Sequence, residues 1–151
     1  MKAVIQRVKK CAVKVGGKVK SEIASGILIL LGVHEDDTEE DASNLADKCA
    51  ALRIFDDGSG KMNLSVRDVG GCAMVVSQFT LYGDVRKGNR PNYMQAAKPE
   101  LAERLYNYFV SCLEKSLGKE KIATGIFREM MDVELTNDGP VTIIIEIKEH
   151  D

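Results

Sequence analysis

The chain has 151 residues, 44% of them hydrophobic and 29% charged, and its formal net charge is −2. This length predicts one domain with its own core, spanning residues 1–151, and the composition excludes wholesale disorder and a collagen-like chain. The small net charge excludes a protein that coats duplex nucleic acid, so contact with nucleic acid should be local. No apolar run approaches the roughly 20 residues that a membrane-spanning helix needs, and the opening MKAVIQRVKK is no signal peptide. We therefore expect a cytoplasmic protein without a membrane partner.

Cysteine and histidine give little sign of metal or triad chemistry. The four cysteines are far apart and are expected to be small buried hydrophobes: Cys11, Cys49, Cys72 and Cys112. Only His34 and His150 could join them, and no short ligand spacing exists, so we expect no metal site. His34 is expected at the surface and His150 at a frayed end, which disfavours a Ser-His-Asp triad.

In chain order, alternating and apolar runs predict a series of strands. Residues 3–8, 12–15 and 18–23 are strand-like, and Gly16-Gly17 between the last two predicts a hairpin turn. Residues 26–33 form a continuous apolar run typical of a buried strand, and residues 72–81 form a second strand candidate. Residues 130–135 and 141–147 are predicted strands joined by a hairpin turn at TNDGP.

Two segments have a helical pattern. Between residues 38 and 53 the apolar side chains share one helical face, and Thr38 with Asp41 resembles a capping box. A second helix should begin near Pro99 and end at Gly118. The sum predicts an α+β fold, with a mostly antiparallel sheet curled toward a β-barrel and two helices packed on it.

Three polar features could carry function. Ser77, Gln78, Phe79 and Thr80 follow an apolar strand, Asn137–Pro140 lie between two strands, and residues 86–91 form a basic loop with Gly and Pro. On spacing alone the first is an ordinary strand end, the second an ordinary hairpin turn and the third a solvated or phosphate-binding loop. The bond between Gly139 and Pro140 could be cis, which only proline permits cheaply.

Taken together, the segments SQFTLY at 77–82 and NDGPVT at 137–142 resemble the two signature motifs of the D-aminoacyl-tRNA deacylase family. The segments MKAVIQRV, GILILLGV, LRIFDD, GKMNLSV and KGNRP also look like this family, in its order and spacing. The resemblance covers nearly the whole chain. It implies a homodimer without metal or organic cofactor that hydrolyses the ester between a D-amino acid and the 3′-terminal adenosine of tRNA, a step of translation quality control.

The resemblance also implies roles for particular residues. Ser77, Gln78, Phe79 and Thr80 would line the catalytic site, and a cis peptide between Gly139 and Pro140 would enter the site of the other subunit. Met131 and Arg7 match positions that line or support the pocket.

The labile ester needs a placed water and a stabilised oxyanion rather than a strong nucleophile. The backbone N–H groups of Phe79 and Thr80 are our candidates for the donors that stabilise this oxyanion, and the substrate's 2′-hydroxyl would assist the attacking water. A nucleophilic Thr80 is the alternative. Carbonyls of Gly139 and Pro140 would hold the α-amino group and exclude L side chains, whereas glycyl-tRNA would pass. Phe79 could stack on adenosine, and Lys87, Arg90 and the basic N-terminal strand could contact the acceptor stem.

Three other functions are consistent with parts of the pattern. A related branch carries a trans Gly-Pro bond and clears L-alanyl-tRNA. A dimeric RNA-end or DNA-associated module would keep the fold without turnover. A general esterase would depend on the Thr80 hydroxyl and would cleave plain esters.

Overall fold

The computed structural model describes residues 1–148. In chain order the main elements are β1 (Lys2–Val15), β2 (Lys18–Ile23), β3 (Gly26–Gly32), α1 (Glu39–Ala51), β4 (Phe55–Asp56), β5 (Met62–Leu64), β6 (Cys72–Ser77), η1 (Phe79–Tyr82), α2 (Pro99–Leu117), η2 (Lys119–Lys121), β7 (Ile122–Thr124) and β8 (Asp132–Glu146). The predicted hairpin at Gly16-Gly17 is confirmed. The short elements β4, β5, β7 and η2 were not predicted.

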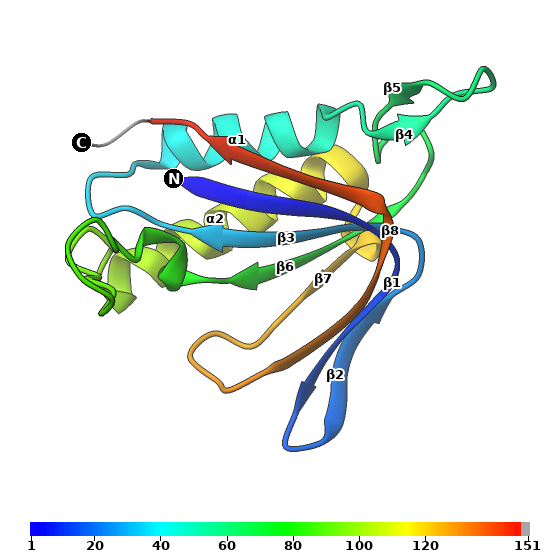
Figure 1. The fold of residues 1–151 in the computed structure, drawn as a ribbon. Helices are drawn as coiled ribbons and strands as arrows, with labels where there is room; N and C mark the ends of the chain where they lie inside the picture. The colour runs from blue at the N-terminus through cyan, green and yellow to red at the C-terminus, as the bar shows by residue number, and fades with distance from the viewer. Residues whose placement is uncertain (149–151) are drawn as a thin grey trace.

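The main sheet is mixed. Its order is β2-β1-β3-β6-β7, with β8 paired along the other edge of β1. Pairs that involve β1 are antiparallel, whereas β3–β6 and β6–β7 are parallel. The α1 and α2 crossovers make the parallel pairs possible, because a parallel connection needs a long return path. The Ser21 hydroxyl in β2 donates to the Thr124 carbonyl in β7 at 2.6 Å, so the curled sheet is nearly closed (Figure 1).

Both predicted helices are confirmed, and both lie on one face of the sheet (Figure 1). Thr38 caps α1 in a capping box with Asp41, and the acidic residues Glu39, Glu40 and Asp41 of the first turn lie at the positive end of the helix dipole, which explains them without a functional role. Pro99 begins α2, and Gly118 follows its last residue with φ +104°. The Met1 ammonium lies 2.7 Å from Asp37 Oδ1 in a fully buried ion pair beside these helices.

The sheet buries apolar side chains on both faces. The larger cluster lies between the sheet and the two helices and includes Ile5, Ile29, Leu45 and Phe109. A smaller cluster, with Val8, Leu28 and Met74, fills the inside of the curl. Burial on both faces accounts for the continuous apolar sequence of β3.

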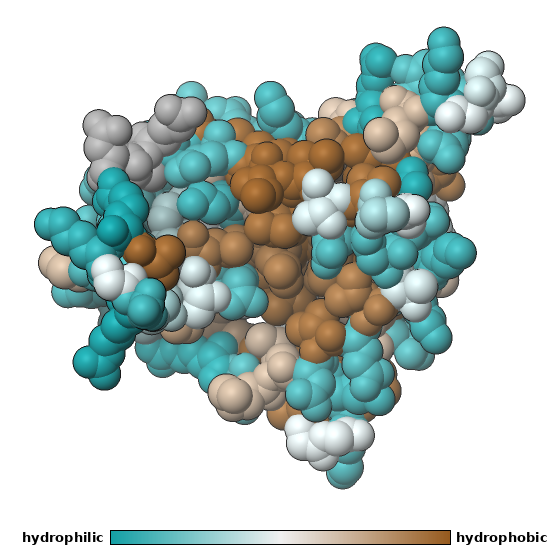
Figure 2. Space-filling view, in the orientation of Figure 1, coloured by the Kyte–Doolittle hydropathy of each residue, from teal (hydrophilic) through white to brown (hydrophobic). Residues whose placement is uncertain are grey.

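One strip of this sheet remains open. Val4 pairs with Leu30 on one side and with Ile144 on the other, so the three side chains form a row on the face opposite the helices. Val4 and Leu30 are half-buried, and Ile144 is 68% exposed. Figure 2 shows an apolar area over the middle of this face. An apolar strip of this kind is a candidate contact surface for another molecule.

Two strand predictions were wrong in detail. Residues 130–147 do not form a hairpin, because both halves of β8 pair with β1 and the TNDGP segment is a bulge within one long strand. The strand expected over residues 72–81 ends at Ser77, and the chain turns into the 3-10 helix η1. In each case a polar segment changes the path of a strand that the apolar pattern alone would continue.

His34 was predicted at the surface and is buried, with only 3% exposed. Its Nδ1 accepts the Asp36 N–H at 3.0 Å, and its ring packs edge-on against Tyr82. Cys11 and Cys49 are buried as predicted, whereas Cys72 and Cys112 are half-buried. Within residues 1–148 no helix is long and apolar enough to span a membrane, and no three potential ligands are grouped to hold a metal ion. His150 lies outside the described residues.

Candidate functional site

The first polar cluster forms a tight turn at the end of β6. The Gln78 N–H donates to the Leu31 carbonyl at 2.8 Å, which fixes the start of the turn to β3. Phe79 begins η1, and the Gly83 N–H closes its end on the Thr80 carbonyl at 2.9 Å. In the described part of the chain, neither the Phe79 nor the Thr80 backbone N–H has an acceptor. The turn thus presents two unpaired backbone donors on exposed residues, available to an oxygen atom of a ligand.

The side chains of this turn offer no strong nucleophile. The Thr80 hydroxyl accepts a hydrogen bond from the Gln78 side-chain amide. Among residues 1–148, no histidine or carboxylate hydrogen-bonds to this hydroxyl. A threonine nucleophile needs a base within hydrogen-bond reach. The geometry therefore favours the backbone N–H groups of the turn over the Thr80 hydroxyl as the groups that interact with a ligand.

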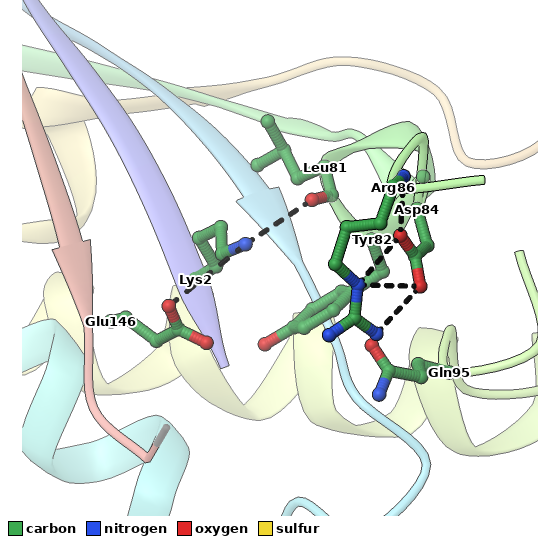
Figure 3. Close-up of a pocket in the computed structure, with 8 residues that line it drawn as sticks. Lys2, Leu81, Tyr82, Asp84, Arg86, Gln95 and Glu146 are labelled. Carbon is green, nitrogen blue, oxygen red and sulfur yellow. Dashed lines mark hydrogen bonds and ion pairs between the residues drawn. The ribbon is translucent and has the colours of Figure 1, made fainter. Parts of the chain in front are cut away.

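Lys2 links this turn to the two long strands. Its Nζ lies 3.4 Å from the Leu81 carbonyl, 3.9 Å from a Glu146 carboxylate oxygen and 5.0 Å from the centre of the Tyr82 ring. Figure 3 shows Lys2 and Glu146 on one side of a cavity, with Asp84 and Arg86 on the other. The cavity, of about 250 Å³, lies directly beside η1. Lys2 was not predicted as a site residue, because a lysine in a basic strand carries no distinctive signal.

Met131 lies near the same strand end. Its sulfur accepts the Ile126 N–H at 3.3 Å and packs against Gly125. The Gly125 N–H in turn donates to the Val75 carbonyl in β6 at 3.0 Å. A Cβ atom on Gly125 would meet the Met131 sulfur at 2.7 Å and Val76 at 3.6 Å. Met131 is thus held beside β6, two strand positions from Ser77.

The second polar cluster forms the bulge in β8. Asn137 spans it, because its side-chain amide donates to the carbonyls of Arg7 and Val141 at 3.0 and 3.1 Å. Arg7 holds it from the other side, where Nε donates to the Asp138 carbonyl at 2.9 Å and Nη1 to the Ile54 carbonyl at 2.6 Å. The bulge therefore projects the exposed Gly139-Pro140 pair from a braced base, and their peptide bond is cis.

Gly139 cannot be replaced without moving this backbone. A Cβ atom there would lie 2.4 Å from the Val141 nitrogen and 2.8 Å from its Cγ2. Real Cβ atoms essentially never approach other atoms this closely, and the first contact is with backbone rather than with a flexible side chain. A glycine is required for this shape.

The structure does not bring the two clusters together within one chain. Ser77 is in register with Leu31 and, through it, with Ala3, whereas the bulge lies opposite Arg7. Three strand spacings and four residues along β1 separate the two clusters, which corresponds to roughly 15–20 Å. Ser77–Thr80 and Met131 therefore form one group, and Arg7, Gly139 and Pro140 form another.

The basic loop after η1 is anchored at both ends. Asp84 and Asn92 exchange backbone hydrogen bonds at 2.8 and 2.9 Å, so residues 84–92 form a closed loop. Lys87 and Arg90 are exposed on it. Just beyond it, the exposed Tyr93 ring packs edge-on against Phe79 with ring centres 5.2 Å apart. Tyr93 was missed from the sequence, since nothing local indicates that it returns to the first cluster.

Several curated proteins resemble this chain over almost its whole length. A curated relative from Koribacter versatilis, named D-aminoacyl-tRNA deacylase, is 55% identical over 149 residues and covers 98% of both chains. One from Thermus aquaticus with the same name is 55% identical and covers 99% of this chain and 97% of its own. A third, from Caldicellulosiruptor saccharolyticus and also so named, is 56% identical over 148 residues, 98% of both chains.

Solved structures and a family model complete these comparisons. A structure named c-Myc DNA Unwinding Element Binding Protein is 44% identical, with a TM-score of 0.93 over 97% of this chain and 98% of its own. One described as a probable eukaryotic D-amino acid tRNA deacylase is 16% identical, with a TM-score of 0.83 over 95% and 97%, and shows the fold alone. The family model described as D-Tyr-tRNA(Tyr) deacylase matches residues 4–146. The chain belongs to this D-Tyr-tRNA(Tyr) deacylase family.

Proposed function

We propose that the protein is a hydrolase that cleaves the ester between a D-amino acid and the 3′-terminal adenosine of tRNA, acting in the cytoplasm. The names of three relatives at 55–56% identity support this activity. The structural observation that carries it is the turn at Phe79 and Thr80, which exposes two unpaired backbone N–H groups at a strand end.

Hydrolysis of this ester passes through a tetrahedral intermediate with a negative oxygen. The Phe79 and Thr80 N–H groups would hydrogen-bond to that oxygen, and losing one such donor typically costs about 100- to 1,000-fold in rate. The attacking water would be assisted by the ribose 2′-hydroxyl of the substrate, because no histidine or carboxylate among residues 1–148 hydrogen-bonds to the Thr80 hydroxyl. The absence of a base bonded to Thr80 within residues 1–148 argues against the Thr80-dependent esterase.

Selection for D-amino acids requires the second cluster. We infer that Gly139 and Pro140 of one subunit enter the site formed by Ser77–Thr80 and Met131 of the other. Within one chain these groups are roughly 15–20 Å apart, so they can act on one ester only if two chains combine. The apolar row of Val4, Leu30 and Ile144 offers a surface for a second copy.

In such a shared site the carbonyls of Gly139 and Pro140 would hold the α-amino group of the substrate. An L side chain would then meet backbone atoms, whereas a D side chain would point away and glycine would meet nothing. Arg7 and Asn137 support this wall without contacting the substrate, because they brace the carbonyls on either side of the bulge. The expected substrates are D-aminoacyl-tRNAs of many side chains, together with glycyl-tRNA.

A second candidate function comes from the structure named c-Myc DNA Unwinding Element Binding Protein, which is 44% identical to this chain. On this basis the chain would bind DNA without turnover. The net charge of −2 of this chain does not favour binding along duplex DNA.

The assay for the proposed function compares D-tyrosyl-tRNA, L-tyrosyl-tRNA, glycyl-tRNA and L-alanyl-tRNA side by side, with EDTA present. We expect loss of the D and glycyl esters while the L ester stays intact. Hydrolysis of L-alanyl-tRNA with an intact D-tyrosyl ester would assign the protein to the alanyl branch. No hydrolysis of any ester, together with saturable binding of duplex DNA, would support the DNA-binding function instead.

A further inference from the structure

The charge of the chain is unevenly placed around the first cluster. Between residues 69 and 99 the only carboxylate is Asp84, whereas four cations occur there: Arg86, Lys87, Arg90 and Lys98. Three of these cations lie on the loop at 84–92, in a protein whose net charge is −2. The loop is therefore a local cationic surface, directly after the turn that carries Phe79 and Thr80.

Hydrogen bonds within the chain hold this loop in shape. Asp84 and Asn92 close it through two backbone hydrogen bonds, and the Asn92 side chain accepts the Met94 N–H at 2.8 Å. The Asp84 carboxylate accepts the Arg86 backbone N–H at 3.0 Å and its guanidinium at 2.7–3.1 Å. These hydrogen bonds from Arg86 lower the pKa of Asp84 to about 2, so the pair persists at neutral pH. Figure 3 shows Arg86 and Asp84 lying together on the wall of the cavity beside η1.

Lys87 and Arg90 differ from Arg86 in their partners. Neither makes an ion pair or a hydrogen bond with any of residues 1–148, and both are exposed. Their charges are thus available to a ligand without first breaking a contact within the chain. A polyanion is the ligand that such a pair attracts most strongly.

Aromatic surface lies beside these cations. Phe79 is 56% exposed and Tyr93 is 40% exposed, and their rings pack edge-on. The Tyr93 ring also lies against Gly83, since a Cβ atom there would meet it at 3.0 Å. The loop, the aromatic pair and the turn at Thr80 are therefore joined by contacts into one continuous surface. Exposed rings interleaved with cations are typical of surfaces that bind single-stranded nucleic acid.

We propose that this surface, made of Tyr93, Lys87 and Arg90 with Phe79 at its edge, binds the unpaired 3′ nucleotides of the tRNA that precede the terminal adenosine. Tyr93 stacks on a base, and Lys87 and Arg90 contact phosphates. Arg86 and Asp84 position the loop. A duplex hides its base faces, so the aromatic pair favours the single strand over the acceptor stem. This inference rests on the proposed function, since it places the ester in the turn at Phe79 and Thr80.

The test compares three D-tyrosyl esters that share the same reacting bond: full tRNA, a tetranucleotide ending in CCA, and adenosine alone. The double variant Lys87→Gln/Arg90→Gln should lower kcat/KM for the tRNA and the tetranucleotide by roughly 25-fold at 0.1 M salt, and should reduce the salt slope of log kcat/KM by about 1.4. Tyr93→Ala should lower kcat/KM for these two substrates by about 5- to 150-fold, whereas Tyr93→Phe should retain most of the original kcat/KM. Cleavage of the adenosine ester should stay within twofold.

A matched control removes the same charge elsewhere. Lys18 and Lys20 are exposed on β2, which pairs with the far half of β1, so Lys18→Gln/Lys20→Gln should leave all three reactions within twofold. Equal losses in the two double variants would overturn the inference, since they would indicate general attraction rather than a site. So would equal losses on tRNA and adenosine esters, or a loss on tRNA that is absent on the tetranucleotide. Failure of the unaltered protein to cleave any ester would instead refute the proposed function.

Discussion

Replacing Gly139 by alanine tests the shape of the β8 bulge. The new Cβ would lie 2.4 Å from the Val141 nitrogen, about 1 Å short of the 3.4 Å at which ordinary contact begins. Arg7 and Asn137 hold the base of the bulge, so the shift must fall on the Gly139-Pro140 tip. A displacement of about 1 Å in a positioning group costs about 100-fold in rate. We therefore expect kcat/KM for D-tyrosyl-tRNA to fall about 100-fold.

The same displacement should weaken the exclusion of L side chains, so the preference for the D ester over the L ester should fall at least tenfold. Gly58→Ala is the matched control, because a Cβ atom at Gly58 meets nothing within 4 Å. The assay measures single-turnover deacylation of both tyrosyl-tRNAs by each variant. A Gly139→Ala protein with unaltered rate and unaltered D preference would refute the role given to the bulge.

Four further substitutions or probes give direct measurements. Asp37→Ala leaves the buried Met1 ammonium unpaired and should lower the free energy of unfolding by about 3–5 kcal/mol in urea at fixed protein concentration; a loss no larger than that of the exposed Asp36→Ala control would contradict the ion pair. Thr38→Ala removes the α1 cap and should cost about 1 kcal/mol by the same titration, whereas no change would contradict the capping box. Thr80→Val keeps the backbone N–H and should retain at least a tenth of kcat; a loss of 10,000-fold would instead identify a nucleophile. Burial raises the pKa of the Cys49 thiol to about 12, so at pH 8 it stays protonated, and mass spectrometry should find it alkylated only after unfolding.

Local sequence patterns were enough for the elements whose signals are local. The capping box at Thr38 and the Pro99 and Gly118 ends of α2 all lie within a few residues of the structure they specify. The hairpin at Gly16-Gly17 is equally local. Strand order was beyond these patterns, because the parallel pairing of β3 with β6 depends on where the α1 crossover returns the chain.

The misread positions depend on contacts distant in sequence. The TNDGP segment has the composition of a hairpin turn, and only pairing of both its flanks with β1 makes it a bulge. His34 is buried because Tyr82, 48 positions along the chain, packs against its ring. Tyr93 lies beside the first polar cluster through its contact with Phe79. The motifs at 77–80 and 137–142 predict site residues only through their resemblance to a family, since neither is distinctive on its own.

We propose that the two clusters act in one site supplied by two chains, and subunit mixing tests this arrangement most directly. Phe79→Pro removes one N–H of the turn at the first position of η1, where proline is tolerated, and Gly139→Ala displaces the bulge. Each variant alone should be nearly inactive. After unfolding and refolding together in equal amounts, half of the dimers would be mixed, and each mixed dimer would hold one intact shared site. We predict recovery of about a quarter of the original D-tyrosyl-tRNA deacylation, and no recovery in the mixture would contradict the account.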